Sequence, residues 1–240
     1  MKVLIYADEG VSPFSLQETL NTFREFFSQV ELVNHQVLND AAWEQETSLL
    51  IIPGGRDIPY DRLLKGKGTA KIRKFVENGG SFLGLCAGAY FGAAEVIFEK
   101  GSALEVHEMR DLKFFPGAAV GTLYSHSPFK YESEEGTHPS QITFQENELH
   151  LYYNGGCAFK DADKYPEVSI LARYKDAENQ AAIIHSKIGK GNVILSGVHF
   201  EVDPTSLKKE KYHPMTIEKL IHSDLKRKEL VTSIINKLCN

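Results

Sequence analysis

Short apolar runs alternate with longer amphipathic stretches over the first hundred positions of the chain. The apolar runs occupy residues 3–7, 30–33, 49–52 and 81–85. Between and after them, residues 69–78 and 87–98 are predicted to form helices, and a further helix is expected to begin at Ser15 as its N-cap. Continuous apolar strands that are separated by helices predict an α/β fold, in which helices cover both faces of a parallel sheet.

The pattern changes in the middle of the chain. From residue 104 to residue 173, short strand-like segments are separated by Gly, Pro and Asn. Asn154-Gly155 follows an apolar triplet and indicates a β-hairpin turn, so turn geometry is favoured over chemistry for this segment. These segments predict an antiparallel β extension of the same sheet. Two more strands and two helices are expected at residues 181–185, 192–196, 216–222 and 225–238.

The size and composition of the chain fit one globular domain. Of its 240 residues, 42% are hydrophobic and 25% are charged, which is enough apolar material for a core and excludes a largely disordered protein. The sequence has no internal repeat, low-complexity segment or linker-like stretch. We therefore expect a single domain over residues 1–240.

Charge, hydropathy and cysteine usage exclude several classes of protein. The net charge is −5 and basic residues are scattered, which argues against a nucleic-acid binder. No apolar run reaches the ~18 residues of a membrane helix, and the N-terminus does not resemble a signal peptide. Cys86, Cys157 and Cys239 are too widely spaced for a disulfide framework or a paired-cysteine metal site. We expect a cytoplasmic protein with no metal, cofactor, nucleic-acid or membrane partner.

Cys86 is the candidate nucleophile. It lies in the string Gly84-Leu85-Cys86-Ala87-Gly88, between a predicted strand and a predicted helix, where sites form in parallel α/β sheets. This G-x-C-x-G spacing matches the nucleophile elbow of G-x-S-x-G hydrolases, with Cys in place of Ser. The glycines are needed because side chains at both positions would collide with the strand and the helix. The N-terminus of the following helix stabilises a thiolate.

His199 and Glu201 are the candidate groups for proton transfer. Both follow the apolar residues 193–195, and alternation in an extended segment places them on one side. The carboxylate can then orient the imidazole, and the imidazole can take the thiol proton of Cys86. Taken alone, His199 fits an ordinary histidine at the end of a strand better, and only its occurrence together with Cys86 favours the catalytic interpretation.

Further candidates lie at the ends of other predicted strands. Gly54 and Gly55 precede Arg56, and two glycines allow backbone N–H groups to face a developing oxyanion, although a plain turn has the same pattern. The N–H of Ala87, directly after the candidate nucleophile, is a second oxyanion donor. Glu9 is either one more carboxylate of the site or an exposed turn residue.

Five strings of this sequence together resemble a known family. They are PGGRDIPY at residues 53–60, GLCAGAY at 84–90, FFPG at 114–117, YYNGG at 152–156 and LSGVHFE at 195–201. In this order they are similar to the class I glutamine amidotransferase-like superfamily. More specifically, they resemble the N-terminal domain of eukaryotic-type biotin-protein ligases and its stand-alone bacterial relatives, over most of the chain from residue 3 to about residue 202.

The resemblance implies a flavodoxin-like three-layer α/β/α sandwich. It also implies a Cys-His-Glu triad formed by Cys86, His199 and Glu201. PfpI-like relatives place an acid from the end of the first strand near the cysteine, and by analogy Glu9 is a second group that tunes it.

The sequence departs from the amidotransferase pattern in two ways. Glutamine-hydrolysing members usually carry Gln soon after the elbow glycine, whereas Gly88 is followed by Ala89-Tyr90-Phe91, a pattern typical of the branch associated with biotin ligases. The sequence also has no Gly-Arg-Gly-Arg-type biotinyl-adenylate loop and ends where a ligase domain would begin, so we expect no biotin ligation.

Two main hypotheses of function follow. The first is a Cys-dependent hydrolase or amidotransferase-like enzyme that acts on a small-molecule amide or related carbonyl, alone, as a homo-oligomer or with a partner enzyme. The second is a catalytically silent binding or regulatory module that retains the fold. A third hypothesis is that Cys86 is a redox-sensing thiol, which predicts reversible oxidation without turnover.

Overall fold

One large β-sheet runs through the computed structural model, which describes residues 1–124, 126, 129–130 and 133–239. The centre of the sheet is parallel, with strands in the order β2-β1-β3-β4-β13. These strands are β1 (Lys2–Tyr6), β2 (Gln29–Val33), β3 (Thr47–Ile52), β4 (Ser81–Leu85) and β13 (Gly191–Ser196). The parallel centre that the apolar runs predict is confirmed, with small shifts in the strand bounds.

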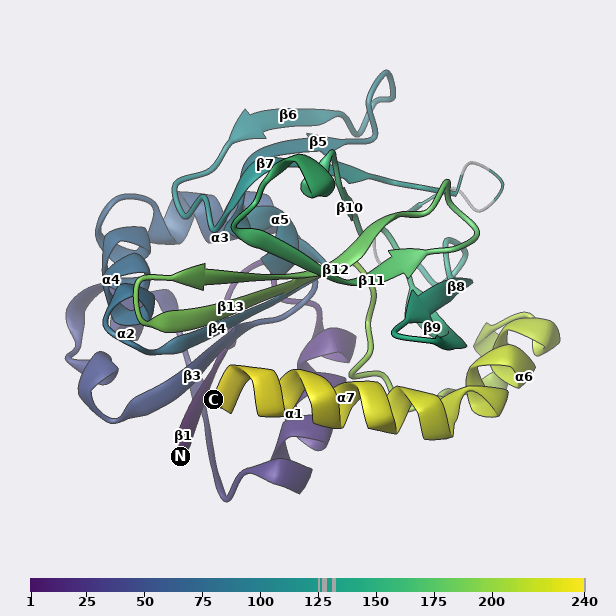
Figure 1. Ribbon diagram of the computed structural model, residues 1–240, viewed down its shortest axis with the longest axis horizontal. Helices are drawn as coiled ribbons and strands as arrows, with labels where there is room; N and C mark the ends of the chain where they lie inside the picture. The colour runs from purple at the N-terminus through teal and green to yellow at the C-terminus, as the bar shows by residue number, and fades with distance from the viewer. Residues whose placement is uncertain (125, 127–128, 131–132, 240) are drawn as a thin grey trace.

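Antiparallel strands extend this centre on the β13 side (Figure 1). The extension continues through β12 (Gln180–Ile188), β10 (Ala158–Phe159), β7 (Phe115–Gly121), β5 (Ala93–Phe98) and β6 (Val106–Met109), with β5 and β7 parallel to each other. A branch from β12 contains β11 (Val168–Tyr174), β8 (His138–Phe144) and β9 (Asn147–Tyr153). The antiparallel extension from the middle of the chain is also confirmed.

Helices cover both faces of the parallel centre. Alternate side chains of β1 explain why: Val3 and Ile5 pack in the apolar core under α1 and α7, whereas Leu4 and Tyr6 pack in a second core on the opposite face. The first layer contains α1 (Pro13–Phe26) and α7 (Asp224–Cys239). The second contains α2 (His35–Asp40), α3 (Asp57–Leu64), α4 (Lys67–Glu77) and α5 (Ala87–Gly92). The fold is therefore the three-layer α/β/α sandwich, as Figure 1 shows.

The remaining elements are short. They are α6 (Pro214–His222), which precedes α7, and the 3₁₀ turns η1 (Trp43–Gln45), η2 (Ala162–Lys164) and η3 (Lys209–Lys211).

The prediction of one helix over residues 87–98 is wrong in its second half. The helix α5 ends at Gly92, and Ala93 to Phe98 form β5, which pairs with β6 and β7. Apolar residues in a short stretch fit a helix or a strand equally well, and here the partner strands decide because they satisfy the backbone of this segment.

The start of α1 also differs from the prediction. Ser12 is the N-cap, followed by Pro13, and its side chain accepts a hydrogen bond from the Ser15 N–H at 3.4 Å. Pro is favoured in the first turn of a helix because its missing N–H would have no partner there. Ser15 therefore lies inside the first turn, and its hydroxyl does not cap the helix.

The predicted β-hairpin at Asn154-Gly155 is not formed. The strand β9 ends at Tyr153, and the next strand, β10, pairs with β12 and β7 instead of β9. A Cβ on Gly156 would lie 1.7 Å from the Gly197 carbonyl oxygen. Glycine is required there because two backbones cross in direct contact, and this segment passes the carboxyl ends of β4 and β13.

Candidate active site

Cys86 occupies a sharp turn between β4 and α5. Its backbone has φ 48° and ψ −104°, a conformation that L-residues rarely adopt and that costs on the order of 1–3 kcal/mol. The surrounding hydrogen bonds hold it there: the Cys86 N–H donates to the Ser196 carbonyl at 2.8 Å, and the Cys86 carbonyl accepts from the Ala89 and Tyr90 N–H groups. The turn is thus the strand-to-helix elbow that the G-x-C-x-G spacing predicts.

The two flanking glycines permit this turn for a steric reason. A Cβ on Gly84 would lie 2.4 Å from the Gly88 carbonyl oxygen. A Cβ on Gly88 would lie 2.0 Å from the carbonyl oxygen of Ile52, at the end of β3. Both distances are far shorter than a van der Waals contact, so any side chain at these positions would push α5 away from the sheet.

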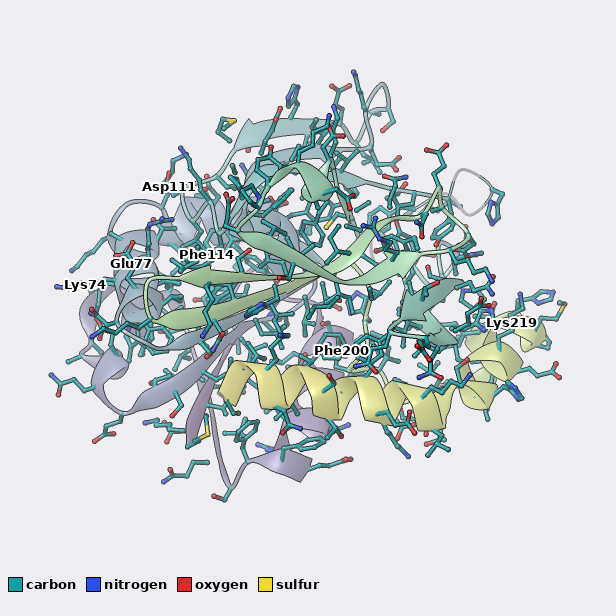
Figure 2. The ribbon with its side chains drawn as sticks, in the orientation of Figure 1. Lys74, Glu77, Asp111, Phe114, Phe200 and Lys219 are labelled. Atoms are coloured by element: carbon teal, nitrogen blue, oxygen red, sulfur yellow. The ribbon has the colours of Figure 1, made fainter. Side chains whose placement is uncertain are left out.

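His199 and Glu201 follow β13 and point to the same side of the chain. His199 Nδ1 and Glu201 Oε1 are 2.7 Å apart, and both side chains are buried. The intervening Phe200 points away from them, and Figure 2 shows it beside α7. Arg227 of α7 donates to the Phe200 carbonyl at 3.0 Å, and the His199 N–H donates to the Tyr152 carbonyl of β9 at 2.9 Å. The segment is therefore held from both sides.

Besides Glu201, the His199 ring also has the thiol of Cys86 as a neighbour. Burial on its own lowers the pKa of His199, but the carboxylate of Glu201 and the thiolate of Cys86 outweigh it by charge and hydrogen bonding and raise that pKa to about 10. Nδ1 of the ring is bonded to Glu201, so Nε2 is the nitrogen available for the hydrogen bond with Cys86. The sulfur also lies 3.8 Å from the Asn154 carbonyl oxygen.

The glycine loop after β3 contributes one backbone donor, the N–H of Gly55. Gly55 has φ +148°, and a Cβ there would lie 2.0 Å from the Gly10 carbonyl oxygen, so only glycine fits. The loop pairs with the 10–12 segment through the Gly54 carbonyl and the Arg56 N–H. This pairing directs the Gly55 N–H away from that segment. Within the described part of the chain, no hydrogen bond uses the N–H of Gly55 or of Ala87.

A cavity of about 470 Å³ opens above Cys86 and His199. Apolar and aromatic side chains form part of its wall, and polar groups form the rest. The lining includes Val11, Phe14, Phe129 and Tyr152 together with Ser12, Arg56, Glu134 and Asn154. A concave, mostly apolar cavity with a few convergent polar groups is typical of a small-molecule site.

The predicted site residues differ in where the structure places them. Cys86, His199, Gly54, Gly55 and Arg56 line this cavity, and Glu201 lies directly behind His199. Ala87 lines a small adjoining hollow beside Cys86.

Glu9 is not brought to the cavity. Its carboxylate forms an exposed ion pair with Arg62 of α3, with the nitrogen and oxygen 2.6 Å apart. The acid beside the imidazole is therefore Glu201.

Asn154, Glu134 and Ser15 are site residues that pattern reasoning did not select. Asn154 belongs to the segment interpreted as a turn, although the YYNGG string already contained it. Glu134 accepts a hydrogen bond from the Tyr152 hydroxyl at 3.0 Å on the cavity wall. Ser15 was interpreted as a helix cap. No local pattern marks the last two residues, because only the folded chain brings them to the sheet edge.

Comparison with known families agrees with this architecture. The family model described as "Biotin-protein ligase, N terminal" matches residues 1–239. The chain belongs to this family. An uncharacterized protein of Chlamydia muridarum is 41% identical over 211 residues, which is 85% of this chain and 81% of that protein.

A second relative of the biotin-protein ligase N-terminal family is a full ligase. The biotin–protein ligase of Schizosaccharomyces pombe is 39% identical over 212 residues, which is 84% of this chain but only 33% of the ligase. The chain thus corresponds to about a third of that enzyme.

Solved structures with the same fold include amidotransferases. A glutamine amidotransferase of Thermotoga maritima superposes with a TM-score of 0.59 at 14% identity, covering 100% of this chain and 98% of that one. The PurLQS structure of Thermotoga maritima gives a TM-score of 0.57 at 14% identity, covering 94% and 97% of the two chains. At this identity the likeness establishes the flavodoxin-like amidotransferase fold.

The described residues contain neither a metal-ligand cluster nor a membrane-spanning helix. Within them, no three His, Cys, Asp or Glu side chains are grouped so as to hold a metal ion. None of the helices in the described ranges has the length and apolar character to cross a membrane.

Proposed function

We propose that this protein is a Cys-dependent hydrolase or amidotransferase-like enzyme that acts on a small-molecule amide or a related carbonyl compound. The observation that carries the proposal is the arrangement at the floor of the cavity. There the Cys86 thiol faces the ring of His199, and the opposite ring nitrogen is bonded to Glu201 at 2.7 Å. A nucleophile, a base and a group that orients the base are the three parts that nucleophilic catalysis requires.

In the proposed reaction, Cys86 and His199 form a thiolate–imidazolium pair, in which the thiol proton already lies on His199. The sulfur attacks the carbonyl carbon of the substrate. The carbonyl oxygen becomes an oxyanion, which the free N–H groups of Gly55 and Ala87 bind. His199 then gives its proton to the leaving nitrogen, the C–N bond breaks, and a thioester remains on Cys86. Water, deprotonated by His199, hydrolyses this thioester and releases the acid and the free thiol.

Glu201 has an electrostatic role in this proposal. Its negative charge stabilises the imidazolium that forms when His199 accepts the proton, and its Oε1 fixes the ring orientation. The raised pKa of His199 supports this role, because the charge of Glu201 contributes to it.

The identity of the amide is a separate part of the proposal. Tyr90 follows the elbow glycine in the region where glutamine-hydrolysing relatives carry Gln, and its hydroxyl donates to the carbonyls of Gly155 and Gly156 at 3.3 and 2.9 Å. This side chain supports the 154–156 segment from within the core. We therefore propose that glutamine is one amide to test among several, and that an ammonia-accepting partner enzyme follows only if glutamine is hydrolysed.

Selective alkylation of Cys86 tests whether its thiol is activated. Cys86 is 6% exposed, Cys157 is fully buried and Cys239 is exposed. Burial raises the pKa of the Cys157 thiol well above its usual value, and partial burial also raises that of the Cys239 thiol. If accessibility alone decided reactivity, iodoacetamide would modify Cys239 first. We expect Cys86 to react first near neutral pH, because among the three cysteines it is the one that lies beside the His199 imidazole in the proposed site.

The matched variants are Cys86→Ala and Cys239→Ser, tested on a panel of amide and ester substrates. Hydrolysis that Cys239→Ser retains and Cys86→Ala loses is the expected result. Slower alkylation of Cys86 than of Cys239, with no turnover of any substrate, would contradict the proposal and favour the silent binding module. Reversible oxidation of Cys86 without turnover would favour the redox sensor.

A further inference from the structure

The hydroxyl of Ser15 connects two parts of the proposed site. Ser15 lies in the first turn of α1 and is 1% exposed. It accepts a hydrogen bond from the Gly54 N–H at 2.9 Å and donates one to Glu201 Oε1 at 3.4 Å. The same oxygen of Glu201 is bonded to His199 Nδ1 at 2.7 Å. A directed chain of hydrogen bonds therefore runs from the glycine loop to the carboxylate that orients His199.

The glycine loop, Ser15 and the imidazole are also in steric contact. A Cβ on Gly54 would lie 2.6 Å from His199 Cε1 and 3.0 Å from Ser15 Oγ. The ring of His199 thus rests directly on the backbone that Ser15 holds. Because Ser12 caps α1, the hydroxyl of Ser15 is available for this contact.

Glu201 has few other groups to fix its carboxylate. Its Oε2 is buried and has no hydrogen-bond partner among the described residues. Thr22, two turns along α1 from Ser15, donates to the Glu201 backbone carbonyl at 2.8 Å and does not touch the carboxylate. The orientation of the carboxylate therefore depends on the two hydrogen bonds of Oε1, one with His199 and one with Ser15.

We propose that Ser15 is a positioning residue of the site, an inference that rests on the proposed Cys-dependent chemistry. Its hydroxyl keeps Glu201 Oε1 aimed at His199 Nδ1 and holds the Gly54–Gly55 backbone in register with the imidazole. One side chain thereby aligns the imidazole with the loop that carries the Gly55 N–H. Without it, Glu201 turns more freely, the imidazolium is less well stabilised, and less Cys86 thiolate is present at a given pH.

The test compares Ser15→Ala with Thr22→Val in the full chain. Both variants remove one buried hydroxyl from the same face of α1, and both lose a hydrogen bond to Glu201. Only Ser15→Ala changes the partners of the carboxylate. We expect Ser15→Ala to slow iodoacetamide alkylation of Cys86 by about three- to tenfold near neutral pH, the equivalent of one hydrogen bond, and to move the pH profile to higher pH. The profile of Thr22→Val should stay that of the unmodified protein.

Each other outcome is decisive. An unchanged profile in Ser15→Ala beside a shifted one in Glu201→Gln would overturn the role of Ser15 and leave the proposed function standing. Unchanged profiles in both would contradict the proposed function itself. A Thr22→Val profile shifted as far as that of Ser15→Ala would point to general loosening of α1. A Ser15→Ala protein that melts far below Thr22→Val would assign the hydroxyl to stability. Either of these last two results would overturn the positioning role.

Discussion

At the residue scale, the charge on His199 depends on two neighbouring side chains, those of Glu201 and Cys86. Because folding raises its pKa to about 10, the imidazolium persists through the neutral range. A histidine whose pKa is raised on folding contributes stability that is fully present below its ordinary pKa of ~6.5 and is lost as the pH rises through the raised value. We therefore expect this contribution to stability to weaken only on the alkaline side.

Glu201→Gln removes the nearest charge that sustains the imidazolium. A neutral amide stabilises the imidazolium less, so the pKa of His199 falls and less imidazolium is present to pair with the Cys86 thiolate. We expect Cys86 to be alkylated about ten- to a hundredfold more slowly near neutral pH, since ~1.4 kcal/mol in this pair is a tenfold effect. The measurement is the pH dependence of alkylation by iodoacetamide.

Glu9→Gln is the matched control, because it also neutralises a carboxylate at the end of a strand. The Glu9 side chain is 56% exposed and paired with Arg62, so its loss should leave the alkylation profile in place. A profile shifted by Glu9→Gln and unchanged by Glu201→Gln would contradict the assignment of the acid while keeping Cys86 as the nucleophile.

At the scale of elements, the start of α3 is anchored by a buried ion pair. The helix follows the Gly54–Arg56 loop directly, and Asp57 in its first turn accepts from Arg110 at 2.7 and 2.9 Å. The side chain of Arg110 is 0% exposed and that of Asp57 is 13% exposed. Burial raises the pKa of Asp57, and the neighbouring guanidinium opposes that shift. This pair thus anchors the start of the helix that follows the glycine loop.

Arg110→Met should destabilise the protein strongly. The substitution leaves the Asp57 carboxylate buried without its cation, which typically costs about 3–5 kcal/mol. We expect a loss of that size in the free energy of unfolding measured with denaturant. Arg62→Met, which removes an arginine from the exposed pair with Glu9, should cost less than about 1 kcal/mol. Equal losses in the two variants would show that the Arg110–Asp57 pair has no special structural role.

At the scale of the whole molecule, the chain corresponds to one part of a ligase. The matched region covers 33% of the Schizosaccharomyces pombe biotin–protein ligase. The remaining two thirds of that enzyme have no counterpart in this match, and the sequence has no biotinyl-adenylate loop of the Gly-Arg-Gly-Arg type. Membership in the family therefore relates this chain to the N-terminal part of biotin-protein ligases and does not by itself assign it the activity of the whole enzyme.

The purified protein is accordingly expected to show no ATP-dependent transfer of biotin to an acceptor domain. The assay is incorporation of labelled biotin into the acceptor, with a complete biotin ligase as the positive control and a reaction without enzyme as the background. Incorporation above that background would mean that this chain contains an adenylate-forming site that its sequence motifs do not reveal.

The sequence by itself determines the layers of the fold and the turn that holds Cys86. Apolar runs too short to cover two turns of helix predict the parallel centre correctly, because buried strands must be apolar on both faces. The turn at Cys86 can also be predicted from the local sequence, because a side chain at either of the two flanking glycines would clash with nearby backbone. The start of α1 was missed although Ser12-Pro13 is a local signal, because Ser15 also fits a capping pattern.

Only the tertiary structure decides which distant residues share the site. Whether residues 93–98 form a helix or a strand depends on β6 and β7, which supply their hydrogen-bond partners. Glu201 stands beside the imidazole because the turn after β13 holds both side chains together, whereas Glu9 lies at the surface next to Arg62. Ser15 reaches Glu201 across 186 positions of sequence. Contacts of this kind leave no periodic trace in the chain, because each depends on how distant segments pair or pack in the folded molecule and not on local backbone preference.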